Sequence, residues 1–325
     1  MNPSNYITKV AIVGAGGNSG RFMTEALLKT GKHTVTAITR ADSQNELPDG
    51  VVTKKVDYEQ MSTLVDALKG QDALVITLGG MVPSDTDMKL IQAAGEAGVS
   101  WILPNEWAPD TTNEELIRDV VPFQAKPGTR KAIEDLGKSA YISVLTGFWF
   151  EWSVGIKPAF GFDFTAKCAT FFDDGETKIS VSTWPQVGRA VASLLSLPIR
   201  REGGNKKACL EDYKNRVVYV NSFTVSQKDM LASALRVTGA KEEDWTVVKE
   251  GSKERYEEGL KETGEGNRVG FVKMMYTRVF YPDGNGDFES AKGTLNEALG
   301  LPKENMDEAM ERGIARSKQP QWYDA

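Results

Sequence analysis

The chain has 325 residues, with 39 Lys plus Arg and 45 Asp plus Glu, and its formal net charge of −6 offers no basic field for nucleic acid or an anionic membrane. A single histidine, His33, in a predicted turn, and two distant cysteines, Cys168 and Cys209, argue against a Ser-His-Asp triad and against a zinc site. A chain of this length predicts one large domain or two modest ones with a sizeable core, which excludes a disulfide-stapled mini-protein.

Short apolar segments alternate with helical patterns through the first 147 residues. Strands are expected at 7–13, 35–39, 51–56, 73–78, 100–103 and 140–146, and helices at 18–30, 59–69, 85–97 and 123–136. Parallel strands need long crossover connections, and helices supply them here. The alternation therefore predicts an α/β fold of the Rossmann type, with a doubly wound parallel sheet.

The second half of the chain is less regular. The aromatic-rich stretch 147–164 predicts a pocket wall or a cover, whereas 185–197 predicts a helix and 216–220 a strand that rejoins the sheet. The mixed charges of 241–262 predict a solvated helical face, and 286–316 is again helical in pattern.

These patterns divide the chain into two interleaved parts. We expect a dinucleotide-binding domain over 1–150, which the chain rejoins around 180–222. A smaller α-rich lobe over 151–325 is expected to bind the substrate.

The segment VGAGGNSG follows the first strand and opens the first helix. Gly14, Gly17 and Gly20 lie three residues apart in it. A glycine at the edge of a helix costs roughly 0.5–1 kcal/mol relative to alanine, so three at this spacing need a compensating reason. One reason is close approach of the backbone to a pyrophosphate at the positive end of the helix dipole, although a tight turn without a ligand is the alternative. The predicted cofactor site includes Gly14, Ala15, Gly16, Gly17, Asn18, Ser19 and Gly20, Thr77, Leu78 and Gly79 at the end of the fourth strand, and Arg40, Asn105, Lys126 and Phe148, which are discussed below.

The end of the second strand indicates which dinucleotide binds. An acidic residue there bonds the ribose 2′-hydroxyl of NAD, whereas a cation accommodates the 2′-phosphate of NADP. This chain has Arg40 at that place, with Asp42 two residues later. We therefore expect NADP(H), although a solvent-facing loop arginine is the alternative for Arg40.

The proton donor is not the tyrosine-lysine pair of classical short-chain dehydrogenases, because no tyrosine is followed by a lysine four residues later. Two other segments are more specific. These are ILPNEW at 102–107 and a helix with Lys126, Arg130, Ile133 and Glu134. Together with the glycine-rich turn, Arg40 and YPDGNGDFE at 281–289, they resemble the isoflavone reductase and phenylcoumaran benzylic ether reductase family. This family is the NmrA-like branch of atypical short-chain dehydrogenases.

The resemblance implies roles for several residues. Lys126 corresponds to the family's catalytic acid/base beside the nicotinamide, and Phe148 borders the nicotinamide. Asn105 stands where the family usually has serine, and Pro127 directly follows the lysine, in a first helical turn where its missing N–H is tolerated. Position agrees with the role of Lys126, since ligands of open α/β sheets bind at the carboxyl ends of the strands, although position alone favours the alternative of an ordinary surface lysine.

The run of aromatic residues after 147 predicts both core and pocket. We expect the pocket to include Phe148, Trp149 and Trp152, which suit a flat apolar ligand. With the resemblance, this favours an NADPH-dependent reductase of a small aromatic substrate, phenylpropanoid-like or polyketide. A lysine ammonium is a ready proton donor at neutral pH, so Lys126 would protonate the product oxygen or stabilise its charge.

Two other functions remain open. The chain could be a non-catalytic NADP(H)-sensing regulator of the NmrA-like type, or an isomerase or cyclase that uses the bound cofactor without net redox change. The first residues, MNPSNYITKV, lack the basic and apolar regions of a secretory signal, and no run of eighteen apolar residues follows. We therefore expect a cytoplasmic protein with a small-molecule partner and no membrane or nucleic-acid partner; its oligomeric state stays open.

Overall fold

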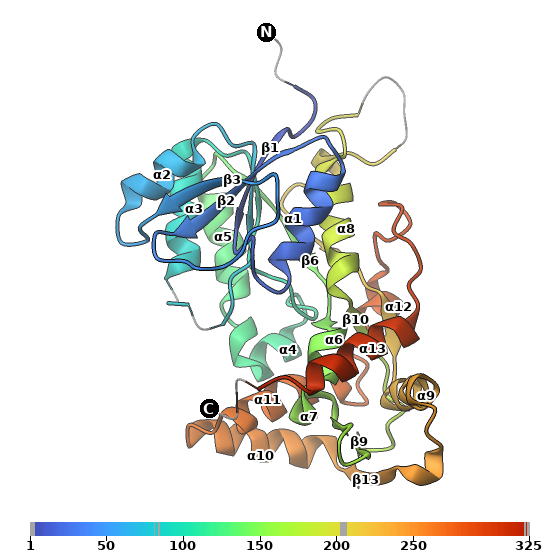
Figure 1. Ribbon diagram of the computed structural model, residues 1–325. Helices are drawn as coiled ribbons and strands as arrows, with labels where there is room; N and C mark the ends of the chain where they lie inside the picture. Colours follow the sequence, from blue (N-terminus) through green and yellow to red (C-terminus); the bar gives the residue numbers. More distant parts are fainter. Residues whose placement is uncertain (1–3, 81, 84, 202–206, 322, 324–325) are drawn as a thin grey trace.

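A computed structural model of the chain describes residues 4–80, 82–83, 85–201, 207–321 and 323. The outermost residues of the two expected domains, 1–3 and 324–325, lie outside the described part. The molecule has a half built around a large sheet and a half built mostly of helices, which Figure 1 shows at the top and the bottom of the view.

A seven-stranded parallel sheet forms the first half, in the order β11-β6-β5-β4-β1-β2-β3. Its strands are β1 (Lys9–Val13), β2 (Thr34–Arg40), β3 (Val52–Val56), β4 (Ala73–Ile76), β5 (Trp101–Leu103), β6 (Ala140–Leu145) and β11 (Arg216–Tyr219). The chain reverses its winding direction between β1 and β4, as in a doubly wound sheet. The predicted Rossmann-like fold is confirmed, including the late strand that rejoins the sheet.

Helices cover both faces of this sheet (Figure 1). On one face lie α1 (Gly20–Lys29) and α8 (Trp184–Leu195); on the other lie α2 (Met61–Leu68), α3 (Thr86–Ala97) and α5 (Lys126–Asp135). Successive residues of β1 point to opposite faces, so Ile12 packs with α1 and α8, and Val13 packs with α2 and α3. Burial on both faces explains why the central strands β4, β5 and β6 are nearly continuous apolar runs, whereas the edge strand β3 is mostly exposed.

The second half combines short helices with two small sheets. The first sheet has the strand order β12 (Phe223–Val225), β10 (Ile179–Ser182), β7 (Phe148–Trp149). The second has the order β13 (Thr246–Glu250), β9 (Cys168–Phe172), β8 (Phe162–Asp163). The helices are α4 (Glu114–Asp119), α6 (Phe150–Val154), α7 (Lys157–Phe160), α9 (Gln227–Thr238), α10 (Ser252–Gly264), α11 (Arg268–Thr277), α12 (Phe288–Lys292) and α13 (Met306–Ser317). They enclose a core that is separate from the two core clusters around the large sheet.

Two secondary-structure predictions for this half need correction. The segment 241–262 is not one helical face, because 242–244 forms a single 3-10 turn, 246–250 forms β13, and the α-helix begins only at Ser252. β13 lies at the edge of its sheet and pairs only with β9, so its exposed side chains show no apolar alternation. The segment 286–316 contains α12 and α13, separated by irregular chain at 293–305.

His33 lies in the turn between α1 and β2, as predicted, but it is buried. Its Nδ1 is 3.1 Å from the carbonyl oxygen of Ile7, and its Nε2 is 3.0 Å from the hydroxyl of Ser196. Burial lowers the pKa of His33. The ring thus connects the residues after α8 to the start of β1, which is a structural role.

Candidate functional site

The carboxyl ends of β1, β4, β5 and β6 meet at one edge of the sheet. The backbone amide of Thr77 donates to the carbonyl of Val13, and the indole of Trp107 donates to the carbonyl of Ile76 at 2.8 Å. The amide of Gly147, after β6, donates to the carbonyl of Ala108 at 3.1 Å. These contacts bring the glycine-rich turn and the segments after β4, β5 and β6 into one site.

Close packing of the backbone requires glycine at positions 14 and 20. Gly14 has a φ of +85°, and a Cβ there would lie 2.0 Å from the carbonyl oxygen of Thr77. A Cβ on Gly20 would lie 2.1 Å from the carbonyl oxygen of Gly14. Close packing of β1, α1 and the end of β4 therefore explains these two glycines without a ligand.

The remaining residues of the turn lie in different surroundings. Gly17 donates its amide to the Gly14 carbonyl, and a Cβ on Gly17 would meet only that oxygen, at 3.2 Å. A Cβ on Gly16 would lie 2.5 Å from the carbonyl oxygen of Glu46, in the loop after β2, so packing requires this glycine too. Ala15 is buried. Packing therefore does not explain Gly17 as it explains Gly14 and Gly20.

The start of α1 has no side-chain cap. The hydroxyl of Ser19, the N-cap residue, lies 2.9 Å from the hydroxyl of Thr77 instead of bonding the helix amides. Within the described residues, the backbone amides of Asn18 and Ser19 have no hydrogen-bond acceptor. Helix N-termini with free amides are ready-made anion sites, so this turn fits a pyrophosphate.

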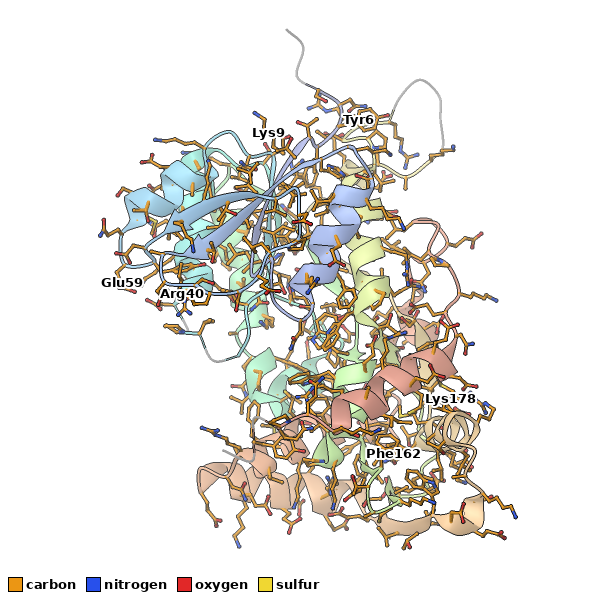
Figure 2. All side chains as sticks on the ribbon, in the orientation of Figure 1. Tyr6, Lys9, Arg40, Glu59, Phe162 and Lys178 are labelled. Atoms are coloured by element: carbon orange, nitrogen blue, oxygen red, sulfur yellow. The ribbon has the colours of Figure 1, made fainter. Side chains whose placement is uncertain are left out.

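Arg40 is the last residue of β2, and its side chain is exposed (Figure 2). Its Nε lies 3.5 Å from a carboxylate oxygen of Asp42, which is also exposed, so the pair is weak. The Nζ of Lys55 lies 3.4 Å from the carbonyl oxygen of Arg40. Two cations thus lie at the end of β2, where a 2′-phosphate would sit.

Lys126 is the first residue of α5, with Pro127 in the same first turn, as predicted. Its ammonium donates to the carbonyl of Asn105 at 2.5 Å. The Asn105 side chain accepts from the amide of Leu78 at 3.2 Å and donates to the carbonyl of Leu78 at 3.1 Å. The segment after β4, which includes Gly79, is therefore held next to the lysine through Asn105.

Asp87, in the first turn of α3, was missed in the sequence analysis. Its Oδ1 is shielded from solvent and has no hydrogen-bond partner among the described residues. Burial raises the pKa of Asp87, while the charge of Lys126 and the amide of Asn105 act in the opposite direction. In the sequence, Asp87 is recognisable only as an acidic residue at the start of the helix after β4. A favourable interaction with the helix dipole is enough to explain an acidic residue there.

A buried ion pair fixes the position of α5. Glu106 is 1% exposed, and its Oε1 accepts hydrogen bonds from Arg130 and from the hydroxyl of Thr111. Arg130 also donates to the Thr111 carbonyl at 2.9 Å. Burial raises the pKa of Glu106, and the charge of Arg130 opposes that effect. Because Glu106 follows Asn105 and Arg130 lies one turn after Lys126, the pair holds the lysine and its acceptor in register.

The three predicted pocket aromatics lie in different surroundings. Phe148 is 8% exposed, and its ring centroid is 4.2 Å from that of Tyr276. Trp149 is partly buried against the core of the large sheet. Trp152 lines a hollow of about 440 Å³ that also includes Asn18 of the glycine-rich turn. A larger hollow, of about 790 Å³, includes Asp72 and Trp101 at the amino ends of β4 and β5 and therefore lies at the opposite edge of the sheet.

No three His, Cys, Asp or Glu side chains among the described residues are grouped so that they could hold a metal ion. None of the helices in the described part of the chain has the length and apolar character needed to cross a membrane.

Comparison with known proteins gives matches over nearly the whole chain. The model of the NmrA-like family matches residues 7–204. Oxidoreductase aprR of Aspergillus flavus is 30% identical over 312 residues, which cover 93% of this chain and 97% of the relative. Phenylcoumaran benzylic ether reductase TP7 of Nicotiana tabacum is 32% identical over 145 residues, which cover 40% of this chain and 46% of the relative.

Solved structures share the fold. One of them belongs to a set of crystal structures of pinoresinol-lariciresinol and phenylcoumaran benzylic ether reductases. It superposes with a TM-score of 0.74 at 19% identity, covering 94% of this chain and 100% of the other. The quinone oxidoreductase QOR2 of Escherichia coli, complexed with NADPH, superposes with a TM-score of 0.66 at 20% identity, covering 93% and 98%.

Proposed function

The chain belongs to the NmrA-like family, and from that premise we propose that it is an NADPH-dependent oxidoreductase that transfers a hydride to a small aromatic substrate. The observation that carries the proposal is the position of Lys126. Its ammonium lies at the carboxyl edge of the sheet, held by Asn105 beside the segment after β4. Ligands of doubly wound sheets bind at this edge.

The proposed cofactor residues follow from the geometry. The free amides of Asn18 and Ser19 at the start of α1 would bind the pyrophosphate, and Gly17 leaves room for it. Arg40 would meet the 2′-phosphate, with Lys55 adding positive charge nearby. The NADPH bound in the quinone oxidoreductase of similar fold supports this choice of cofactor. When bound, the dinucleotide supplies the hydride.

Lys126 would act on the oxygen of the substrate. Its ammonium would donate a proton to that oxygen, or stabilise the negative charge that develops there. The carboxylate of Asp87 would orient the ammonium group, and the Glu106–Arg130 pair would keep α5 in place. The tobacco relative named phenylcoumaran benzylic ether reductase supports an aromatic substrate, as does a solved structure of similar fold with NADP+ and (+)-pinoresinol, which superposes with a TM-score of 0.69 at 16% identity.

Assay of purified protein with NADPH and a panel of aromatic ketones, enones and benzylic ethers tests this function. We expect consumption of NADPH only with a suitable acceptor, and one reduced product for each NADPH oxidised. Tight NADPH binding without turnover across the panel would favour the sensor. A changed product without net consumption of NADPH would favour the isomerase or cyclase.

Replacement of Arg40 by alanine is expected to weaken NADPH binding roughly tenfold and to leave NADH binding nearly unchanged, because only NADPH carries the 2′-phosphate. Titration of the dihydronicotinamide fluorescence measures both affinities. Arg21→Ala is the matched control, since Arg21 is an exposed arginine of α1 that pairs with Glu25. Equal loss of affinity for both dinucleotides would contradict the assignment of Arg40.

A further inference from the structure

The hollow that includes Asn18 and Trp152 lies between the glycine-rich turn and the C-terminal helix α13. Three aromatic rings line it, those of Phe22 on α1, Trp152 on α6 and Trp184 at the start of α8. The ring centroid of Trp184 is 6.1 Å from that of Phe22 and 6.2 Å from that of Trp152. This continuous aromatic surface is suited to one or two fused rings.

Two arginines of α13 line the same hollow, and their surroundings differ. Arg312 pairs with Glu151, a carboxylate that is 3% exposed, at 3.1 Å. Arg316 lies over the ring of Trp152, with its guanidinium carbon 4.3 Å from the ring centroid. Among the described residues no carboxylate forms an ion pair with Arg316, and its Nη1 is shielded from solvent without a hydrogen-bond partner. Burial lowers the pKa of Arg316.

The unmatched groups of the hollow are all donors. Besides Arg316, the indole Nε1 of Trp184 is shielded from solvent and has no acceptor in the described structure. A buried polar donor without an acceptor is costly, and a partly buried guanidinium without a counter-ion adds to that cost. The missing component is therefore an acceptor, and next to a guanidinium an anionic one is favoured.

We propose that this hollow binds a flat aromatic molecule that carries one carboxylate, with its ring against Trp184 and Phe22 and its carboxylate on Arg316. The inference rests on the proposed function, because it gives the aromatic substrate of that function an anionic group. The hollow, at about 440 Å³, has room for a two-ring ligand.

The phosphates of the dinucleotide are the other source of an anion, because Asn18 belongs to the glycine-rich turn. The lining favours the carboxylate. A pyrophosphate gains nothing from three aromatic rings, whereas an aryl carboxylate uses the rings and the guanidinium together. The test therefore measures both anions.

Binding of 2-naphthoate and of its neutral amide, 2-naphthamide, tests the proposal in protein without NADPH. Quenching of tryptophan fluorescence reports occupancy, since Trp152 and Trp184 line the hollow. We expect naphthoate to bind at least tenfold more tightly than naphthamide. Arg316→Gln should weaken naphthoate binding by roughly tenfold to a hundredfold, the range for a charge-assisted hydrogen bond, and should leave naphthamide binding nearly unchanged.

Two further variants keep the test independent of misfolding. Arg316→Lys retains the charge and should retain part of the preference for naphthoate. Lys318→Gln removes an exposed charge just after α13, outside the hollow, and should change nothing. Thermal unfolding and NADPH titration of each variant show whether the fold and the cofactor site are intact.

Equal affinity for naphthoate and naphthamide, no saturable binding of either, or no effect of Arg316→Gln on naphthoate would each overturn the proposal. It would also fail if Arg316→Gln weakened NADPH binding and left naphthoate unchanged, because Arg316 would then serve the cofactor. The proposed function fails separately, through absence of NADPH binding or of NADPH consumption by the unmodified protein.

Discussion

Replacement of Lys126 by alanine is expected to lower kcat by a factor of about 10² to 10⁴, the range for loss of a positioned general acid. NADPH binding should change little, because the glycine-rich turn and Arg40 are proposed to supply that affinity. Steady-state kinetics with NADPH and the best acceptor of the panel measures kcat. The Kd for NADPH comes from a separate fluorescence titration.

The matched control for this prediction is Lys131→Ala. Lys131 lies on the same helix, is exposed and pairs with Asp135, so its removal should leave kcat unchanged. If Lys126→Ala weakened NADPH binding while turnover per bound cofactor stayed normal, Lys126 would be a binding residue and its catalytic role would be lost. Unchanged kinetics in Lys126→Ala would remove it from the site altogether.

Alanine at Gly20 is expected to destabilise the protein by about 3 kcal/mol or more. The added Cβ would lie 2.1 Å from the Gly14 carbonyl, and a backbone oxygen cannot move aside as the end of a flexible side chain can. Alanine at Gly17 should cost less than about 1 kcal/mol, because its Cβ would meet only the Gly14 oxygen, at 3.2 Å. Urea unfolding at equilibrium measures both free energies.

Gly17→Ala, which should cost little stability, is expected to have a large effect on NADPH binding. The methyl group of Gly17→Ala would occupy the open side of the turn, where the pyrophosphate is proposed to lie, and should weaken NADPH binding at least tenfold in a protein that remains folded. Gly264→Ala is the control, since its Cβ would meet nothing within 4 Å at the end of α10. Normal NADPH affinity in Gly17→Ala would argue that the turn serves packing alone.

Local patterns were sufficient to predict the elements of the first half. Apolar runs of four to seven residues, separated by helical stripes, indicated six strands and their helices. The signal was strongest for the central strands β4, β5 and β6, because burial on both faces makes such strands nearly continuous apolar runs. The edge strand β13 was missed because its exposed residues carry no such pattern and its partner, β9, lies more than seventy residues earlier. The local sequence of a β-strand that is stabilised by a distant partner carries little pattern that would identify it as a strand.

The sequence by itself determined the Rossmann-like fold, the glycine-rich turn, Arg40 at the end of β2, and Lys126 at the start of its helix. Only the tertiary structure decided how these residues are supported. It separated Gly14 and Gly20, which packing requires, from Gly17, and it brought Asp87 and the carbonyl of Asn105 to the lysine. It also placed Arg316 of the last helix over Trp152. Contacts between residues this far apart along the chain depend on the packing of whole helices and strands, so they cannot be predicted from the local periodicity of the sequence.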